Sequence, residues 1–253
     1  MTSKNHLLQF SERRVLPLKR IAGITSATFV LLFLLGATEI NIGVNNQVNT
    51  GKIVGGNCLQ GNGNVTKKRL VVEQFKDIVV DGVFVVNVVC GQSPDITITA
   101  DQNLHSLISA VVKNGKVHLS TSGSYCTTNS FIADISLNEL ASITADGSSE
   151  IAVECNSTAN GKMEIDLRGT SSMVVSGKAK TVGMSLQDST ELDALRLKAE
   201  NVHIKASDAS TAHINVSQKL SGAGSDASTI SYRGQPPIVK VQTADASECS
   251  PED

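Results

Sequence analysis

The sequence predicts an all-β solenoid, and two observations support this fold class. A short polar signature recurs, and its Ser or Thr positions follow one another at steps of 23, 18, 21, 18 and 19 residues. Short segments that alternate apolar and polar residues separate the signatures, which is typical of strands joined by turns. A strand–turn unit of roughly twenty residues cannot bury its own apolar face, so we expect successive units to stack. The signatures occupy residues 146–149, 169–172, 188–190, 208–211, 226–229 and 245–248.

The alternating segments also predict which side chains form the interior of the stack. Alternation places every second residue of a strand on the buried face. The expected interior residues are Ile165, Leu167, Val174, Leu186, Leu192, Leu197, Val202, Ile204, Ile214, Val216 and Ile230.

The composition narrows the function classes. The net charge of −2 over 253 residues argues against a nucleic-acid-binding protein, which needs a basic surface. The chain has no Trp and only two Tyr, which disfavours a sugar site built on stacked aromatic rings. The core must therefore come from Val, Ile, Leu and Ala.

The N-terminal region carries a targeting signal. Residues 1–20 form a basic segment, and residues 21–38 form an uncharged, apolar one. An apolar run of this length is close to the lower limit for spanning a bilayer, so both a signal anchor and a cleaved signal peptide fit. The basic flank keeps the N-terminus cytoplasmic in either case. The domain is therefore expected outside the cytoplasmic membrane.

The rest of the chain divides into a flexible linker at 39–64, a β-domain at 65–245 and a polar tail at 246–253. The linker assignment rests on Gly- and Asn-rich composition. In the first half of the domain we expect two strands around Asp81-Gly82, whose continuous apolar run suggests burial on both faces. Asn114-Gly115 is a strong hairpin signal. Further strands are expected at 95–99, 132–136 and 238–241, with a helical turn within 101–111.

Five cysteines have no spacing typical of a metal site. Outside the cytoplasm they can form disulfides, and their odd number leaves one unpaired. The best candidates for a pair are Cys90 and Cys126, because both end strands in the half of the domain without repeats. The remaining cysteines are Cys58, Cys155 and Cys249.

Two sets of side chains are candidates for a metal site. His203 and His213 are ten residues apart, but as metal ligands they need a third partner, and solvent-facing positions on strands explain them equally. Asp208, Asp226 and Asp245 repeat at the same place in successive signatures and are expected to form a column. Either each Asp caps its own turn, or the column holds a weakly bound Ca²⁺ or ligand ammonium group.

An ordered set of motifs resembles the head GIN domain family of auto-transporter adhesins over residues 65–245. The motifs are Arg69, Phe75, Ile78, Val80, Gly82, Phe84 and Val86, then Thr99, Ala100, Asp101, Asn103 and Leu104, then residues 115–119, and finally Tyr232, Gly234 and Pro236. The resemblance implies a right-handed parallel β-helix-like domain on the outside of a bacterium. It implies no catalytic residues.

These observations together predict a non-catalytic, envelope-associated protein that acts as an adhesin or a binding scaffold. It is expected in the inner membrane with its domain in the periplasm, or in the periplasm if the signal is cleaved. Its expected partner is an envelope protein or a glycan, with no cofactor, no nucleic acid, and a membrane contact through residues 21–38 if they are retained. The alternatives are a polysaccharide-active β-helix enzyme and a structural or stress-sensing envelope protein. A groove that gathers several acidic or basic groups would favour the enzyme.

Overall fold

The computed structural model describes residues 58–252, and this part of the chain is all-β, as the sequence predicts. The expectations for residues 1–20, 21–38 and most of the linker lie outside the described residues. Within the described part, no helix is long and apolar enough to cross a membrane. The strands are β1 (Leu59–Gln60), β2 (Val65–Leu70), β3 (Asp77–Gly82), β4 (Val85–Cys90), β5 (Asp95–Asp101), β6 (Ile108–Lys113), β7 (Lys116–Thr121), β8 (Tyr125–Cys126), β9 (Ile132–Leu137), β10 (Ser142–Gly147), β11 (Glu150–Cys155), β12 (Lys162–Leu167), β13 (Ser172–Leu186), β14 (Glu191–Ala206), β15 (Thr211–Gly224), β16 (Thr229–Arg233), β17 (Ile238–Thr243) and β18 (Glu248–Pro251).

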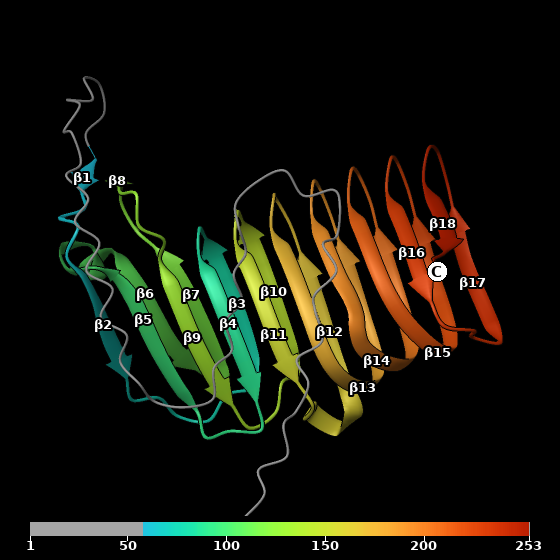
Figure 1. Cartoon of the computed structure of the whole chain (residues 1–253), viewed down its shortest axis with the longest axis horizontal. Coiled ribbons are helices and arrows are strands. Elements are labelled where there is room, and N and C mark those ends of the chain that lie inside the picture. Colours follow the sequence, from blue (N-terminus) through green and yellow to red (C-terminus); the bar gives the residue numbers. More distant parts are fainter. Residues whose placement is uncertain (1–57, 253) are drawn as a thin grey trace, which may run out of the picture. The chain divides into compact units, whose positions relative to one another are not determined.

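The strands of the main sheet form two ladders, and each ladder continues from strand to strand along the long axis of the domain (Figure 1). The first ladder has the order β6-β7-β3-β10-β12, followed by the last parts of β13, β14 and β15 and by β17. The second ladder has the order β2-β5-β9-β4-β11, followed by the first parts of β13, β14 and β15 and by β16 and β18. Pairing is parallel throughout the signature region.

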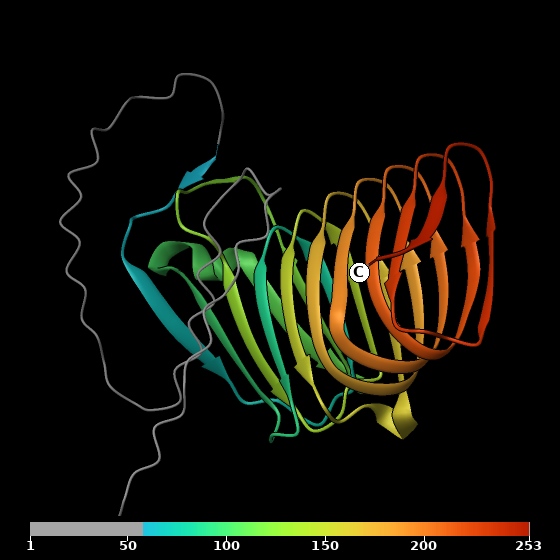
Figure 2. The same ribbon diagram turned by 45° about the vertical axis from the view of Figure 1, so that its right-hand side comes forward.

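Two kinds of connection join the ladders, and we name the edges of the sheet after them. The turn edge carries the tight turns that lead from the first ladder to the second, such as residues 207–210 between β14 and β15. The bend edge comprises residues 177–181, 195–201 and 217–219, where β13, β14 and β15 curve from the second ladder back to the first. Figure 2 shows the narrow turns along one edge and the broad bends along the other.

We call one pass of the chain through the first ladder and then the second a coil. The first coil consists of β3 and β4, which do not pair with each other. They pair instead with β10 and β11, which lie about 65 residues later in the chain. The intervening segment covers this end of the sheet and includes the antiparallel hairpin of β6 and β7. Its turn residues Asn114 and Gly115 have φ angles of 53° and 73°, so the hairpin prediction is confirmed. A 3₁₀ helix at Gln102–Leu107 confirms the predicted helical turn.

Burial follows the alternation of the strands. All the expected interior residues are buried except Val174, which is half-exposed. Its neighbours Met173 and Val175 point inward, because the buried Ser171 directly before the strand sets the alternation. The prediction that 78–89 is buried on both faces is also wrong. Ile78, Val80, Phe84, Val86 and Val88 are buried, whereas the residues between them face outward in part.

The domain is longer than its predicted bounds at both ends. Residues 58–60, expected in the linker, belong to the domain, because β1 pairs with β8 and Cys58 is bonded to Cys126. Residues 248–251, expected in a polar tail, form β18 and pair with β16. In the turn at 244–247, Ser247 N–H donates to Ala244 O at 3.2 Å, as Ser228 N–H does to Ser225 O one turn earlier. The same turn therefore leads into one more strand.

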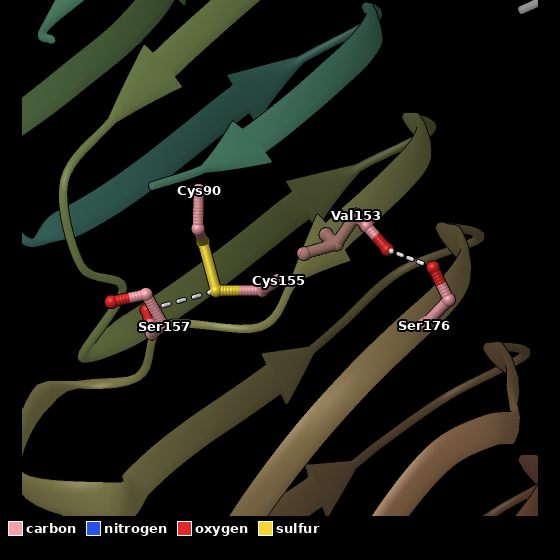
Figure 3. Close-up of a disulfide and its surroundings, with 5 residues drawn as sticks. All are labelled: Cys90, Val153, Cys155, Ser157 and Ser176. Carbon is pink, nitrogen blue, oxygen red and sulfur yellow. Dashed lines mark hydrogen bonds between the residues drawn. A yellow bond between two sulfur atoms is a disulfide. The ribbon is translucent and has the colours of Figure 1, made fainter. Parts of the chain in front are cut away.

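Two disulfides hold the N-terminal part of the domain, and the predicted Cys90–Cys126 pair is wrong. Cys58 is bonded to Cys126, with Cα atoms 5.6 Å apart, and Cys90 is bonded to Cys155, with Cα atoms 4.7 Å apart. Figure 3 shows the second bond, which links the ends of the adjacent strands β4 and β11. Cys90 and Cys126 are therefore each bonded to another cysteine, and Cys126 lies on β8 in the separate sheet of β1 and β8.

Candidate binding surfaces on the edges and outer face

The tight turns share one backbone feature, a residue with positive φ at the same corner of each coil. Glycine fills this corner in the early turns and aspartate in the later ones, because Asp tolerates the left-handed region better than most residues. The corner residues are Gly82, Gly147, Gly169, Asp188, Asp208, Asp226 and Asp245, and the four aspartates have φ angles between 56° and 65°.

The carboxylates of the corner aspartates accept hydrogen bonds from backbone N–H and hydroxyl groups of the turns. Asp188 Oδ2 accepts the N–H of Gly169 at 3.0 Å, and Asp208 Oδ2 accepts the N–H of Asp188 at 3.3 Å. Each of these two carboxylates therefore caps the preceding turn, whereas the sequence suggested that an Asp caps its own. Hydroxyl donors do come from the same turn, with Ser207 Oγ donating to Asp208 and Ser225 Oγ donating to Asp226.

A column of buried hydroxyl side chains lies two residues after the corner, and sequence reasoning missed it. Ser149 Oγ accepts the Phe84 N–H at 3.2 Å and donates to Gly82 O at 3.0 Å, which ties neighbouring coils together. Thr190 Oγ1 and Ser210 Oγ are buried without a hydrogen-bond partner. The available signal was the Ser or Thr that directly precedes the strand after each corner. The column comprises Ser149, Ser171, Thr190, Ser210 and Ser228, each no more than 1% exposed.

The structure places the predicted metal candidates as follows. Asp208, Asp226 and Asp245 lie on the turn edge, exposed and at equivalent corners, so the column itself exists. Residues 58–252 contain no group of three or more His, Cys, Asp or Glu arranged to hold a metal ion. His203 and His213 are on different ladders and are not brought together. His203 Nδ1 is 3.4 Å from Ser221 Oγ, and His213 Nδ1 is 2.7 Å from Glu252 Oε2.

The outer face of the first ladder carries a shallow hollow of about 390 Å³. Its acidic side is Glu164 and Asp166 on β12, and its basic side is His203 and Lys205 on β14. Gly183 on the strand between them leaves room for Glu164, because a Cβ atom at this glycine would lie 2.6 Å from Glu164 Cδ. A second hollow of about 540 Å³ follows, between His203 and Lys205 on one side and Lys240 on the other.

The bend edge carries the third hollow, of about 560 Å³. Lys178, Lys180 and Lys198 line it, and the nearly buried Ala179 and Ala199 lie between them. Because buried alanines alternate with exposed lysines here, the lysines of β13 and β14 project from the same surface. This surface offers positive charge and polar groups rather than an enclosed cavity.

Cys249 is the free cysteine of the described part of the chain and lies on β18, half-buried. Burial raises the pKa of the Cys249 thiol, so the thiol stays protonated at neutral pH. Its chemistry therefore adds no nucleophile to the surfaces described above.

Solved structures to which the chain is similar include two putative adhesins. A putative adhesin from Bacteroides fragilis is 16% identical, and the match covers 77% of this chain and 100% of that one with a TM-score of 0.56. A putative adhesin from Parabacteroides merdae is 20% identical over 77% of this chain and 99% of that one, with a TM-score of 0.47. No protein with a curated description matches the chain.

The sequence itself matches a family model over residues 74–236, which is more than half of the chain. The matched region extends from the segment before β3 to the loop after β16, and so contains nearly all of both ladders. The motifs that carry the resemblance lie inside this region or directly beside it. The chain therefore belongs to the family described as putative auto-transporter adhesin, head GIN domain.

Proposed function

We propose that this protein is a non-catalytic binding module of the bacterial cell envelope, of the adhesin type that its family name describes. The observation that carries the proposal is a continuous polar row on the outer face of the first ladder. Its members come from eight successive strands in register, and such an extended surface with open, shallow hollows suits a large partner better than a small substrate. The row comprises Lys116, Asp77, Ser142, Glu164, Gly183, His203, Ser221 and Lys240.

The proposal includes a location outside the cytoplasm. The two disulfides support it, because such bonds persist in oxidising compartments and are rare in the cytosol. Residues 21–38 would act as the signal anchor or the cleaved signal peptide, with residues 1–20 on the cytoplasmic side. Thiol counting on denatured, unreduced protein should find one free thiol per chain, and five would contradict this location.

We further assign the domain to the right-handed parallel β-helix-like solenoids. Parallel pairing of β10, β12, β13, β14 and β15 in consecutive coils supports this assignment. So does the repetition of one turn corner along the turn edge. A solenoid presents long, regular outer faces, which is the architecture that a surface-binding module needs.

Binding to the envelope can be tested with the purified full chain, kept oxidised so that both disulfides are intact. The chain is incubated with intact cells of the producing species and with separated polysaccharide, protein and membrane fractions of their envelope. Saturable binding to intact cells and to one fraction is the expected result. If no fraction binds saturably while the protein remains folded by circular dichroism, a binding role at the envelope is wrong.

The second candidate is a polysaccharide-active enzyme, and the hollow between β12 and β14 favours it by gathering carboxylates, a histidine and a lysine. Asp166 is engaged by Arg168, whose Nη2 donates to Asp166 Oδ2 at 2.9 Å, so Glu164 is the freer acid. Glycan cleavage assays on the wild type and Glu164→Gln distinguish the candidates. Cleavage that disappears in Glu164→Gln would establish the enzyme, and the same binding without cleavage in both supports the binding module.

A further inference from the structure

Cationic side chains gather on the bend edge of the sheet. All of these side chains are exposed, and none of them forms an ion pair with another residue that the structure describes. Glu200, level with Lys180, is the carboxylate within the same hollow. The cations are Lys178, Lys180, Arg196, Lys198 and Lys219.

The register places like charges beside one another. Lys178 is the direct strand partner of Lys198, whereas Lys180 lies level with the carboxylate of Glu200. Neighbouring strands are roughly 4.8 Å apart, and like charges directly opposite one another destabilise a sheet. The fold does not need these charges, because Ala179 and Ala199 between them provide the buried packing. A bound anion would relieve the repulsion.

The hollow around these lysines also has the groups that recognise a sugar. Thr158, Asn215 and Ser217 line it. Asn215 Nδ2 donates to Leu195 O at 3.0 Å and Ser217 Oγ donates to Ala199 O at 3.2 Å, which leaves their oxygens able to accept sugar hydroxyl groups. Gly161 and the two alanines carry small or no side chains beside these groups. No aromatic residue is among the described residues that line it, so it offers no platform on which nucleic-acid bases stack.

The opposite edge of the sheet has the opposite charge. Asp188, Asp208, Asp226 and Asp245 are exposed along the turn edge. A long anion is therefore repelled from the turn edge and attracted to the bend edge, which orients it along the stack of coils.

We propose that the bend edge binds a linear acidic polysaccharide, whose carboxylate groups lie against Lys178, Lys180 and Lys198 of successive coils. The sugar hydroxyls bond to Thr158, Asn215 and Ser217, and Arg196 and Lys219 extend the site along and across the coils. This inference rests on the proposed envelope-binding function and names the class of its ligand.

The test uses the full oxidised chain and polygalacturonate as the acidic probe, with dextran as a neutral one. The site variant is Lys178→Gln/Lys180→Gln/Lys198→Gln. The matched control is Lys67→Gln/Lys68→Gln/Lys113→Gln, which removes the same charge from exposed lysines at the other end of the domain. We expect wild type and control to bind polygalacturonate within twofold of each other, the site variant to bind at least tenfold more weakly, and dextran not to bind.

Three results would overturn the inference: no binding of polygalacturonate, an equal loss in both triple variants, or equally tight lysine-dependent binding of a single-stranded oligonucleotide or anionic vesicles. The cell-binding experiment separates this failure from failure of the proposed function. If the site variant still binds intact cells like the wild type, the envelope-binding function stands and its ligand contacts another surface.

Discussion

Along the turn edge each coil has a positive-φ corner, and from Gly147 to Asp226 an inward Ser or Thr follows it at the same position, whereas along the bend edge the coils differ in length and register. The pairing of β14 with β15 passes from Ala194–Ile214 to Ala199–Val216, so β14 contains extra residues at its bend. At the turn edge, by contrast, backbone bonds continue from coil to coil, such as Thr211 N–H to Thr190 O at 2.8 Å.

This difference indicates that the turn edge stabilises the domain, whereas the bend edge has side chains available to bind a partner. At the turn edge, backbone amides and buried hydroxyls bond to the neighbouring coil, so a substitution there should change stability. At the bend edge, the exposed lysine and arginine side chains form no ion pair with other described residues, so substituting them should change binding and leave stability nearly unaltered. The following predictions test the structural half of this comparison.

The largest effect is expected at the disulfide between Cys90 and Cys155, which joins the ends of β4 and β11 and lies outside the residues of the bend edge. The bond spans 65 residues of sequence, and cross-links of this length stabilise by about 4 kcal/mol. Cys90→Ala/Cys155→Ala should therefore lower the melting temperature by roughly 10 °C. Calorimetry measures it, with Cys249→Ala as the control that removes a free thiol. If the double variant and the wild type have the same melting temperature, the pairing of β4 with β11 holds these strand ends together without the disulfide.

The two types of turn corner should respond to different degrees when their residues are exchanged. A Cβ atom at Gly169 would lie 2.5 Å from Gly147 O, so Gly169→Asp should destabilise the domain by about 2 kcal/mol. Asp208→Gly loses exposed hydrogen bonds but relieves a left-handed backbone, and its effect should be under about 1 kcal/mol. Urea unfolding measures both. Equal free energies of unfolding for the two variants would mean that the corners are interchangeable.

The buried hydroxyl column should show smaller effects of opposite sign. Ser228 Oγ donates to Ala206 O at 3.2 Å, so Ser228→Ala should cost about 1 kcal/mol. Ser210 Oγ has no partner, so Ser210→Ala should be neutral or stabilise by up to about 1 kcal/mol. Urea unfolding of both variants gives the difference between their free energies of unfolding. If Ser210→Ala is less stable than Ser228→Ala, the prediction is wrong.

The sequence predicted local features better than neighbours in space. Asn114-Gly115 specifies its hairpin by its own backbone preferences, and alternation identified nearly all of the interior. The signature steps, however, were counted from Ser148, Ser171, Ser189 and Ser210, whereas the structure places Ser149 and Thr190 at the level of Ser171 and Ser210. The disulfides were missed for a related reason, because the neighbour of β4 is a strand 65 residues away and no local pattern encodes that.

The smallest effect concerns the aspartate column, where turn capping and cation binding make different predictions. Carboxylates on adjacent coils repel by under about 1 kcal/mol when they face water. Asp226→Asn keeps the corner, because Asn also tolerates positive φ, and keeps an oxygen to accept the Ser225 hydroxyl. The variant should therefore melt slightly higher than wild type at low salt, and the difference should vanish at high salt as screening increases. Millimolar Ca²⁺ should leave both melts unchanged if the column only caps turns. A rise in the wild-type melt with Ca²⁺, absent in Asp226→Asn, would instead assign a cation to this edge and give the turn edge a role in binding.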